Sequence, residues 1–157
     1  MRAAIFSDSH GLLEFALDAL KKIGQVDLIL HAGDHYRDGL KLAAETGLPV
    51  KAVVGNCDYR GGGPVMEVVE LSGRRVLLTH GHLHGVNLSH KKLFEATGEN
   101  AVEAVVFGHT HVAVSVNEGG ILLFNPGSIT RPLDYGSPSY GILEIGEKGI
   151  VPRICRI

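Results

Sequence analysis

The fold is decided first in residues 3–10, whose sequence is AAIFSDSH. A short apolar run there ends directly in polar residues. The next segment, residues 13–20, carries leucine and alanine at helical spacing and charged residues on the opposite face, and the pattern stops at Gly24. Together these segments predict a buried strand followed by an amphipathic helix.

The same kinds of element follow in the next thirty residues. Residues 27–31 predict a second strand, and residues 50–54 predict a third. Between them a helix is predicted from Asp38, as its N-cap, to Thr46, with Gly47 just after its end. Strands this apolar, alternating with helices, predict a buried parallel sheet that helices cover.

The second half of the chain is richer in predicted strands. Residues 66–71 and 75–79 predict a hairpin, and a helix over about 89–104, interrupted near Gly98, leads into a strand at 104–107. No internal repeat or linker interrupts the chain, so residues 1–157 are predicted to form one domain with two packed sheets. The remaining predicted strands cover residues 112–116, 121–124, 140–145 and 150–154.

The composition of the 157 residues excludes several classes of protein. No apolar run approaches the ~18–20 residues of a membrane-spanning helix, and no signal-peptide pattern opens the chain. Two cysteines, Cys57 and Cys155, do not suggest a disulfide framework, so a cytoplasmic protein with free thiols is expected. A formal charge of -2 without a basic block gives no sign of a stable nucleic-acid partner. The unusual feature is the presence of nine histidines.

Residues of metal-ligating types follow five of the predicted strands. Because ligands bind outside the carboxyl ends of the strands in an open α/β sheet, these five segments are expected to meet in one crevice. Each alone has an ordinary alternative, such as an Asx turn at residues 56–58, but their joint occurrence at successive strand ends favours a site. They are Asp8-Ser9-His10, Gly33-Asp34, Gly55-Asn56-Cys57-Asp58, His80-Gly81-His82 and Gly108-His109-Thr110-His111.

The donor atoms of these segments form a mixed oxygen and nitrogen set. Two carboxylates, one amide oxygen and at least four imidazoles suit divalent Mn, Fe, Co, Ni or Zn better than an all-oxygen Ca or Mg site. Seven such ligands are too many for one ion and fit two ions if one carboxylate bridges them. His109 and His111 would point the same way along a continuing strand, whereas a bend would send them to different ions.

In this order, the five segments resemble the calcineurin-like metallophosphoesterases over residues 1–132. The short chain and the loop at residues 125–128, Asn-Pro-Gly-Ser, are most similar to the small YfcE-type phosphodiesterases, which include a relative that serves as a retromer scaffold. The resemblance implies an α/β fold, a four-layer αββα sandwich of two mixed β-sheets flanked by helices. It also implies one ion held by Asp8, His10, Asp34 and His111 and a second held by Asp34, Asn56, His80 and His109, with Asp34 bridging.

One position departs from the pattern of the wider family. Cys57 stands where the family usually has a histidine that assists the leaving group. A thiol with a pKa of about 8.5 is a weaker candidate for that task. We assign the task to His82, with an outer-shell or structural role as the alternative, and expect Asp58 to orient a ligand imidazole.

Other polar residues lie close to these segments in the sequence. Four residues are expected to line the substrate pocket, with solvated loop positions as the alternative: His35, Tyr36, Arg37 and Arg131. His31 lies inside a predicted strand and is expected to be a core histidine with a hydrogen-bond partner.

These features predict a phosphoesterase that depends on two divalent ions, Mn first, with Ni, Co, Fe or Zn as alternatives. A metal-activated hydroxide would attack phosphorus in line. The predicted catalytic residues are Asp34, Asn56, Asp58 and His82. The predicted substrate is a small phosphodiester, with nucleotide-derived esters as one option and phosphomonoesters as an alternative. Without a firm general acid, esters with good leaving groups, such as aryl diesters, are expected to react best.

The competing hypothesis is a non-catalytic scaffold or protein-binding module on the same fold. A scaffold need not keep every ligand, whereas this chain keeps all seven. A metallo-β-lactamase-type hydrolase would need Asp and His soon after the His-x-His pair, where this chain has Val112 and Ala113. Assembly into a homo-oligomer is left open.

Overall fold

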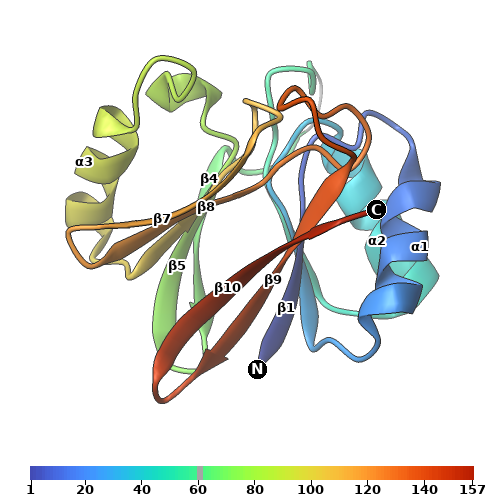
Figure 1. The fold of residues 1–157 in the computed structure, drawn as a ribbon, viewed down its shortest axis with the longest axis horizontal. Coiled ribbons are helices and arrows are strands. Elements are labelled where there is room, and N and C mark those ends of the chain that lie inside the picture. Colours follow the sequence, from blue (N-terminus) through green and yellow to red (C-terminus); the bar gives the residue numbers. More distant parts are fainter. Residues whose placement is uncertain (60–61) are drawn as a thin grey trace.

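A computed structural model describes residues 1–59 and 62–157 (Figure 1). Strands and helices alternate up to Ala52, and strands dominate after it. The helices are α1 Leu13–Ile23, α2 Tyr36–Thr46 and α3 Lys91–Asn100, with a short 3-10 helix, η1, at His82–His84. The strands are β1 Arg2–Phe6, β2 Leu28–His31, β3 Val50–Ala52, β4 Met66–Leu71, β5 Arg74–Thr79, β6 Ala104–Val106, β7 Ala113–Glu118, β8 Ile121–Pro126, β9 Ser139–Gly146 and β10 Gly149–Arg156.

Two five-stranded sheets pack against each other (Figure 1). The first has the order β10-β9-β1-β2-β3, with β1, β2 and β3 parallel and β9 antiparallel to β1. The second has the order β4-β5-β6-β8-β7, with β5, β6 and β8 parallel and both edge strands antiparallel. Helices α1 and α2 cover the outer face of the first sheet, and α3 covers that of the second. The predicted four-layer sandwich of mixed sheets is confirmed.

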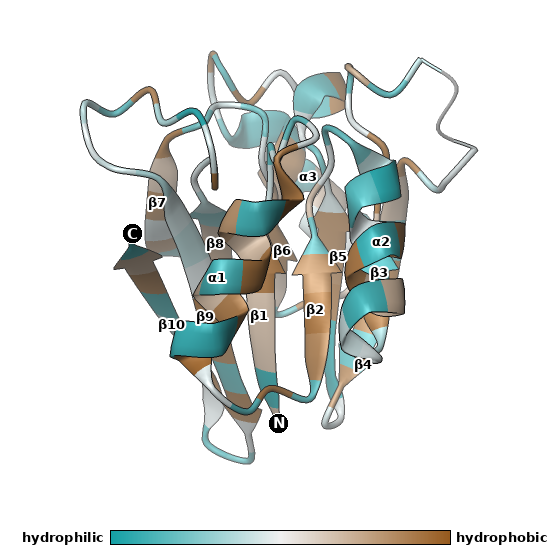
Figure 2. Cartoon of the chain, turned by 90° about the vertical axis from the view of Figure 1, so that its right-hand side faces the viewer, coloured by the Kyte–Doolittle hydropathy of each residue, from teal (hydrophilic) through white to brown (hydrophobic). Residues whose placement is uncertain are grey.

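Consecutive residues of the central strands are buried on opposite sides. Ile5 packs between the sheets with Leu30 and Phe124, whereas the next residue, Phe6, packs beneath the helices with Leu42. Burial on both faces explains why these strands are continuous apolar runs. Figure 2 shows these apolar strands behind the more polar outer faces of α1 and α2. Each such side chain, fully buried, stabilises the fold by about 1.5–3 kcal/mol.

The helix predicted to start at Asp38 begins two residues earlier, at Tyr36, so the prediction of Asp38 as its N-cap was wrong. Asp38 is buried, and its Oδ2 accepts hydrogen bonds from Ser9 Oγ and from the N–H of Gly11, each at 2.8 Å. This side chain therefore fastens the loop after β1 to α2. The pattern around residue 38 could not show this role, because both partners lie far away in the sequence.

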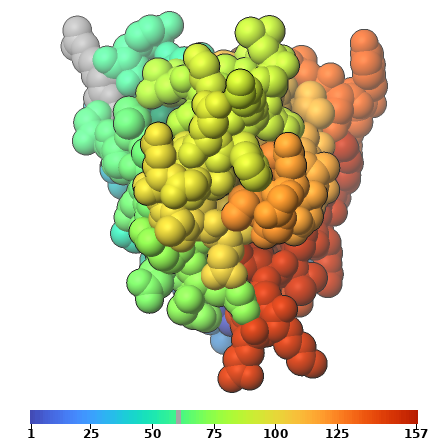
Figure 3. All heavy atoms as spheres, turned by 90° about the vertical axis from the view of Figure 1, so that its left-hand side faces the viewer, coloured from blue at the N-terminus to red at the C-terminus, as the bar shows by residue number. Residues whose placement is uncertain are grey.

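The predicted helix over about 89–104 is α3, which is shorter and continues through Gly98 without interruption. Ala101, with φ of 49°, ends it in the left-handed conformation. Figure 3 shows the side of the molecule that α3 and the segment before it cover. Of the helices in residues 1–59 and 62–157, none is both long and apolar enough to cross a membrane.

Candidate metal centre

Five loops meet at one end of the molecule, where parallel strands finish. They follow β1, β2 and β3 of the first sheet and β5 and β6 of the second, at the upper end of both sheets in Figure 1. These loops carry the five segments that the sequence analysis singled out. The expected convergence of strand ends is therefore observed.

Four side chains form a compact group of metal-ligating atoms. One such atom from each of Asp8, His10, Asp34 and His111 lies within 4.8 Å of all the others. His111 Nε2 lies 3.3 Å from Asp8 Oδ1 and also 3.3 Å from His10 Nε2. His10 Nε2 lies 3.9 Å from Asp34 Oδ2. The structure thus brings together the four residues that the family resemblance assigned to one ion.

Asp34 also belongs to a second group beside the first. Its Oδ1 lies 3.3 Å from His80 Nε2, and that nitrogen lies 3.1 Å from Asn56 Oδ1. The ring centroids of His80 and His109 are 5.2 Å apart. One oxygen of Asp34 therefore faces His10 and the other faces His80, so the two groups share this carboxylate.

The site residues adopt an unusual backbone conformation. Asp8, His10, Asp34, His109 and His111 have positive φ values between 47° and 69°. Each non-glycine residue in this region costs about 1–3 kcal/mol, which the surrounding contacts must offset. The strand does not continue through His109 and His111, and the bend places His111 beside His10 but His109 in the second group.

Backbone carbonyl groups orient two of the imidazoles. His80 Nδ1 lies 2.7 Å from the carbonyl oxygen of Ala32, and His111 Nδ1 lies 2.7 Å from that of Arg131. Because a carbonyl oxygen only accepts hydrogen bonds, each Nδ1 carries a proton. In the neutral ring Nε2 is then unprotonated, and its lone pair is available to a metal ion. A metal-ligating histidine needs one unprotonated ring nitrogen, and in these two residues that nitrogen is Nε2.

Asp8 provides a test of whether these residues fit a metal ion. Its Oδ2 accepts a hydrogen bond from the N–H of His109 at 3.2 Å. Its Oδ1 is buried and, while the facing Nε2 of His111 is unprotonated, has no hydrogen-bond partner among the described residues. An unsatisfied buried oxygen is costly, and its neighbours here are further carboxylate and imidazole donors. The residues present therefore fit a divalent cation of the borderline type.

Comparison with known proteins agrees with this donor set. The model of the calcineurin-like phosphoesterase superfamily domain matches residues 1–148. The chain belongs to the calcineurin-like phosphoesterase superfamily.

This calcineurin-like phosphoesterase is similar to named proteins in sequence and in structure. It is 36% identical over 146 residues to the "Probable metallophosphoesterase YsnB" of Bacillus subtilis. The aligned region covers 92% of this chain and 85% of that protein. It is 32% identical over 169 residues to "Phosphodiesterase YfcE" of Escherichia coli, which covers 92% and 88%. The crystal structure of a Streptococcus pneumoniae predicted phosphoesterase matches with a TM-score of 0.86 at 30% identity, covering 99% and 88%. The expected family and fold are confirmed, and the family is one of metal-dependent hydrolases.

Burial lowers the pKa of some of the imidazoles of the centre. Burial lowers the pKa of His10, and burial together with His80 lowers the pKa of His109. His111 differs, because the hydrogen bond that it donates to Asp8 when protonated raises its pKa. Neutral imidazoles are the form that binds a cation.

Opposing effects act on the pKa of the Asp34 carboxyl group. Burial raises the pKa of Asp34, but His80, a hydrogen bond from Cys57 and His10 lower it, and the net pKa lies below the ordinary value. The N–H of Cys57 donates to Asp34 Oδ1 at 2.9 Å. Burial, and then Asp34 itself, raises the pKa of the Cys57 thiol to about 11. The thiol is therefore an even weaker acid than expected from its sequence position alone.

His82 lies beside the second group. Its ring centroid is 5.3 Å from that of His80 and 6.1 Å from that of His109. Burial, followed by the charges of these two imidazoles, lowers the pKa of His82. Its role as the leaving-group acid stays a prediction.

Asp58 makes its hydrogen bonds with the backbone. Its Oδ1 accepts from the N–H of Tyr36 and its Oδ2 from the N–H of Gly55, each at 2.8 Å. These bonds hold the loop after β3 against the N-terminus of α2, where the helix dipole favours a negative charge. The expected contact with a ligand imidazole is not among them.

The structure also places the other polar residues. His31 is fully buried with its Nε2 3.0 Å from Ser9 Oγ, as expected for a core histidine with a partner. The ring centroid of His35 lies 5.5 Å from that of His10, so His35 belongs to the edge of the centre. Asn87 was missed by the sequence analysis. Its Nδ2 lies 2.9 Å from His109 Nε2, and no motif marks this loop position.

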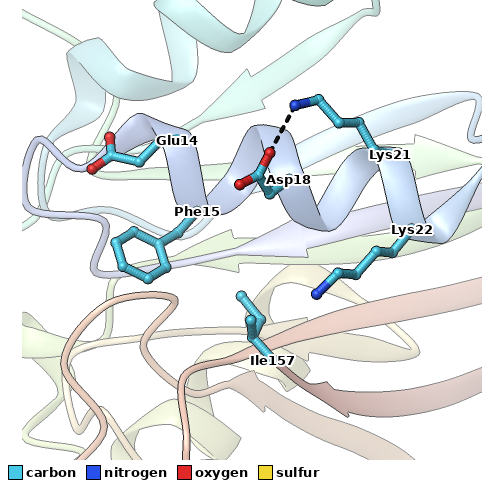
Figure 4. A pocket seen from close by; sticks show the side chains of 6 residues that line it. All are labelled: Glu14, Phe15, Asp18, Lys21, Lys22 and Ile157. Carbon is cyan, nitrogen blue, oxygen red and sulfur yellow. Dashed lines mark hydrogen bonds and ion pairs between the residues drawn. The ribbon is translucent and has the colours of Figure 1, made fainter.

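A separate hollow lies between α1 and the C-terminal residue (Figure 4). Its volume is about 350 Å³. None of the five segments contributes to its lining, so it is distinct from the metal centre. The lining residues are Glu14, Phe15, Asp18, Lys21, Lys22 and Ile157.

Proposed function

We propose that this protein hydrolyses phosphodiesters with the help of two divalent metal ions. The observation that carries the proposal is the position of Asp34, whose oxygens face His10 at 3.9 Å and His80 at 3.3 Å. A carboxylate shared by two groups of donors suits a bridge between two ions. Relatives named metallophosphoesterase and phosphodiesterase support the class of reaction.

The proposed ligands follow from the side chains that lie together. The chemistry that divalent ions supply in such a site is neutralisation of phosphoryl oxygens and a lowered pKa for water. Mn is our first choice, with Ni, Co, Fe and Zn as alternatives, because the donors mix oxygen and imidazole nitrogen. Asp8, His10, Asp34 and His111 would hold one ion, and Asp34, Asn56, His80 and His109 the other.

The protein's own groups prepare the site for this chemistry. The carbonyl oxygens of Ala32 and Arg131 hold His80 and His111 in the ligating tautomer. His82 is our choice of proton donor to the leaving oxygen. Because its pKa is lowered, little of it is protonated at neutral pH, so esters with good leaving groups should react fastest.

The proposed substrate is a small phosphate ester in the cytoplasm. The net charge of -2 and the lack of a basic block support a small molecule over a nucleic acid. Nucleotide-derived diesters are one option, and phosphomonoesters are the alternative.

Reconstitution with metal tests the proposal. Protein stripped with EDTA would be loaded with Mn, Ni, Co or Zn and given bis(p-nitrophenyl) phosphate. We expect metal-dependent turnover and, by isothermal titration calorimetry, two ions per chain. The variant Asp34→Asn should lose most of the turnover and bind both ions more weakly. Asp18→Asn, an exposed change on α1, is the control and should behave like the wild type.

Two results would overturn the proposal. Absence of turnover with every metal would exclude the reaction, and one ion per chain would exclude the shared carboxylate. The scaffold hypothesis expects well under one ion per chain after dialysis against each metal.

A further inference from the structure

Several exposed apolar side chains lie on the loops that carry or adjoin the five site segments. Tyr59 and Leu88 are each 93% exposed, Tyr135 is fully exposed, and Leu83 and Leu133 are 64% and 67% exposed. Single exposed apolar residues are normal on proteins, but several of them on the loops beside one site make those loops a candidate binding surface. We call these five residues the apolar rim.

Two rim residues lie on the segment after β5. Leu83 directly follows His82 within η1. Leu88 directly follows Asn87, whose Nδ2 lies 2.9 Å from His109 Nε2. Both leucines are therefore one residue away from a side chain that contacts or faces the second donor group.

The other three rim residues lie on two further loops of the same end. Tyr59 directly follows Asp58, which is hydrogen-bonded within the loop after β3. The N–H of Leu133 donates to the carbonyl oxygen of His111 at 3.1 Å, and Tyr135 lies two residues further on. The rim thus approaches the centre from three loops that are far apart in the sequence.

Two of the three rim loops carry little free charge, whereas the third has Asp58 and Arg60 on either side of Tyr59 in the sequence. Segments 83–89 and 131–136 contain no lysine, and their charged residues are Arg131 and Asp134. Asp134 is already paired with Arg156 at 2.5 Å. A polyanionic partner needs several cations, so these segments suit an uncharged, apolar group.

We propose that the rim binds the ester group that stays on the phosphate, and that this group is planar and apolar, as in an aryl or nucleoside diester. The inference rests on the proposed phosphodiesterase function. With the phosphate at the metal centre, the rest of a small diester must extend toward the surrounding loops. There Tyr59 and Tyr135 offer exposed rings for stacking, and the leucines offer apolar contact.

Two diesters with the same leaving group test this inference. Methyl p-nitrophenyl phosphate and phenyl p-nitrophenyl phosphate both release p-nitrophenolate and differ only in the group that stays. With Mn-loaded protein, and after division by the uncatalysed rates, we expect kcat/KM for the phenyl ester to be about tenfold higher or more, mainly through KM.

Variants of the rim separate the outcomes. The double variant Tyr59→Ala/Tyr135→Ala should reduce the preference for the phenyl ester about fivefold or more, without changing kcat/KM for the methyl ester. Val151→Ala, a change at an exposed apolar position near the start of β10, is the control and should keep the preference. Thermal unfolding followed by circular dichroism would verify that each variant folds.

Three results would overturn the inference. One is an equal preference for the phenyl over the methyl ester in the wild type and the double variant. Another is a wild-type dimer that the double variant converts to a monomer in sedimentation, since the rim would then be a contact between copies. Absence of turnover of both esters by the wild type would instead overturn the proposed function, and the inference with it.

Discussion

His80 Nδ1 lies 2.7 Å from the carbonyl oxygen of Ala32, so the loop after β5 of one sheet is tied to the end of β2 in the other. The contact decides which nitrogen of His80 faces Asp34. It also leaves almost no room beside the ring. A Cβ on Gly33, the residue after Ala32, would lie 2.7 Å from His80 Nδ1.

The substitution Gly33→Ala should therefore weaken metal binding. The added methyl group displaces the His80 ring, and the φ of +95° strains any residue other than glycine. Loss of a contact that orients a ligand typically lowers metal affinity about 10–100-fold. We expect a loss of that size in a calorimetric titration of metal-free protein with Mn.

Gly120→Ala is the matched control. Gly120 has a similar φ of +85°, but no atom of residues 1–59 and 62–157 lies within 4 Å of its added Cβ. This variant should lose stability to urea by about 1–3 kcal/mol through backbone strain alone and keep the wild-type affinity for Mn. Equal Mn affinities in both variants would contradict the claim that a side chain at Gly33 weakens metal binding by displacing His80.

Asp8→Asn should separate stability from metal binding. Asp8 Oδ1 is buried without a hydrogen-bond partner among the described residues, so removing the charge should stabilise metal-free protein by about 1 kcal/mol. In wild-type protein, metal at a hundred times its Kd should add about 2.7 kcal/mol. The variant should lose most of this increase. Urea unfolding with and without Mn measures both effects, and an unchanged response to Mn would contradict the assignment of Asp8 as a ligand.

The buried His31 should make metal-free protein sensitive to acid. Burial lowers the pKa of His31 from 6.5 to about 4, so between these values the unfolded chain binds a proton that the folded chain does not. Stability should therefore fall as the pH drops from 6.5 toward 4. The difference corresponds to a loss of about 3 kcal/mol.

NMR titration of the imidazole signals checks this expectation directly. The ring of His31 should remain neutral until about pH 4, and urea unfolding of EDTA-treated protein should show the matching loss of stability. His31→Gln removes the titrating group and should flatten the pH dependence by one proton. A His31 pKa near 6.5 in the folded protein would contradict the prediction.

His82→Gln should affect esters according to their leaving group. General acid catalysis contributes about 10²–10⁴-fold for a poor leaving group and little for p-nitrophenolate, which needs no proton. We expect a large loss of kcat for methyl phenyl phosphate and a small one for methyl p-nitrophenyl phosphate. His84→Gln, also in η1, is the control and should change neither. Equal losses for both esters would instead indicate a structural role for His82.

Local sequence patterns predicted much of the architecture. The apolar runs at β1 and β2 appear where the patterns place them, because burial on both faces leaves a strong local signal, and the hairpin of β4 and β5 does so because of its tight turn. The edge strand β3, where Lys51 is exposed, is shorter than the predicted range 50–54. The boundaries of α2 and α3 were less accurate. Asp38 looks like a cap in sequence, but its partners are Ser9 and Gly11 of another loop.

Tertiary contacts decided the details of the centre that no local pattern shows. Asn87 reaches His109 from an unremarkable loop. Asp58 holds backbone N–H groups where an imidazole was expected. Such contacts depend on how separate loops pack, and their residue types are common in turns of any protein.

The sequence by itself determined the chemistry of this protein and where along the chain it lies. Carboxylates, an amide and imidazoles follow the ends of strands, and the carboxyl ends of parallel strands share one edge of a sheet. Only the tertiary structure decided how these donors are grouped. The left-handed backbone at His109 and His111 separates two neighbouring imidazoles, and the packing of two sheets places Asp34 between His10 and His80. Such grouping arises from long-range contacts that hold strained local conformations, and a linear pattern carries no record of them.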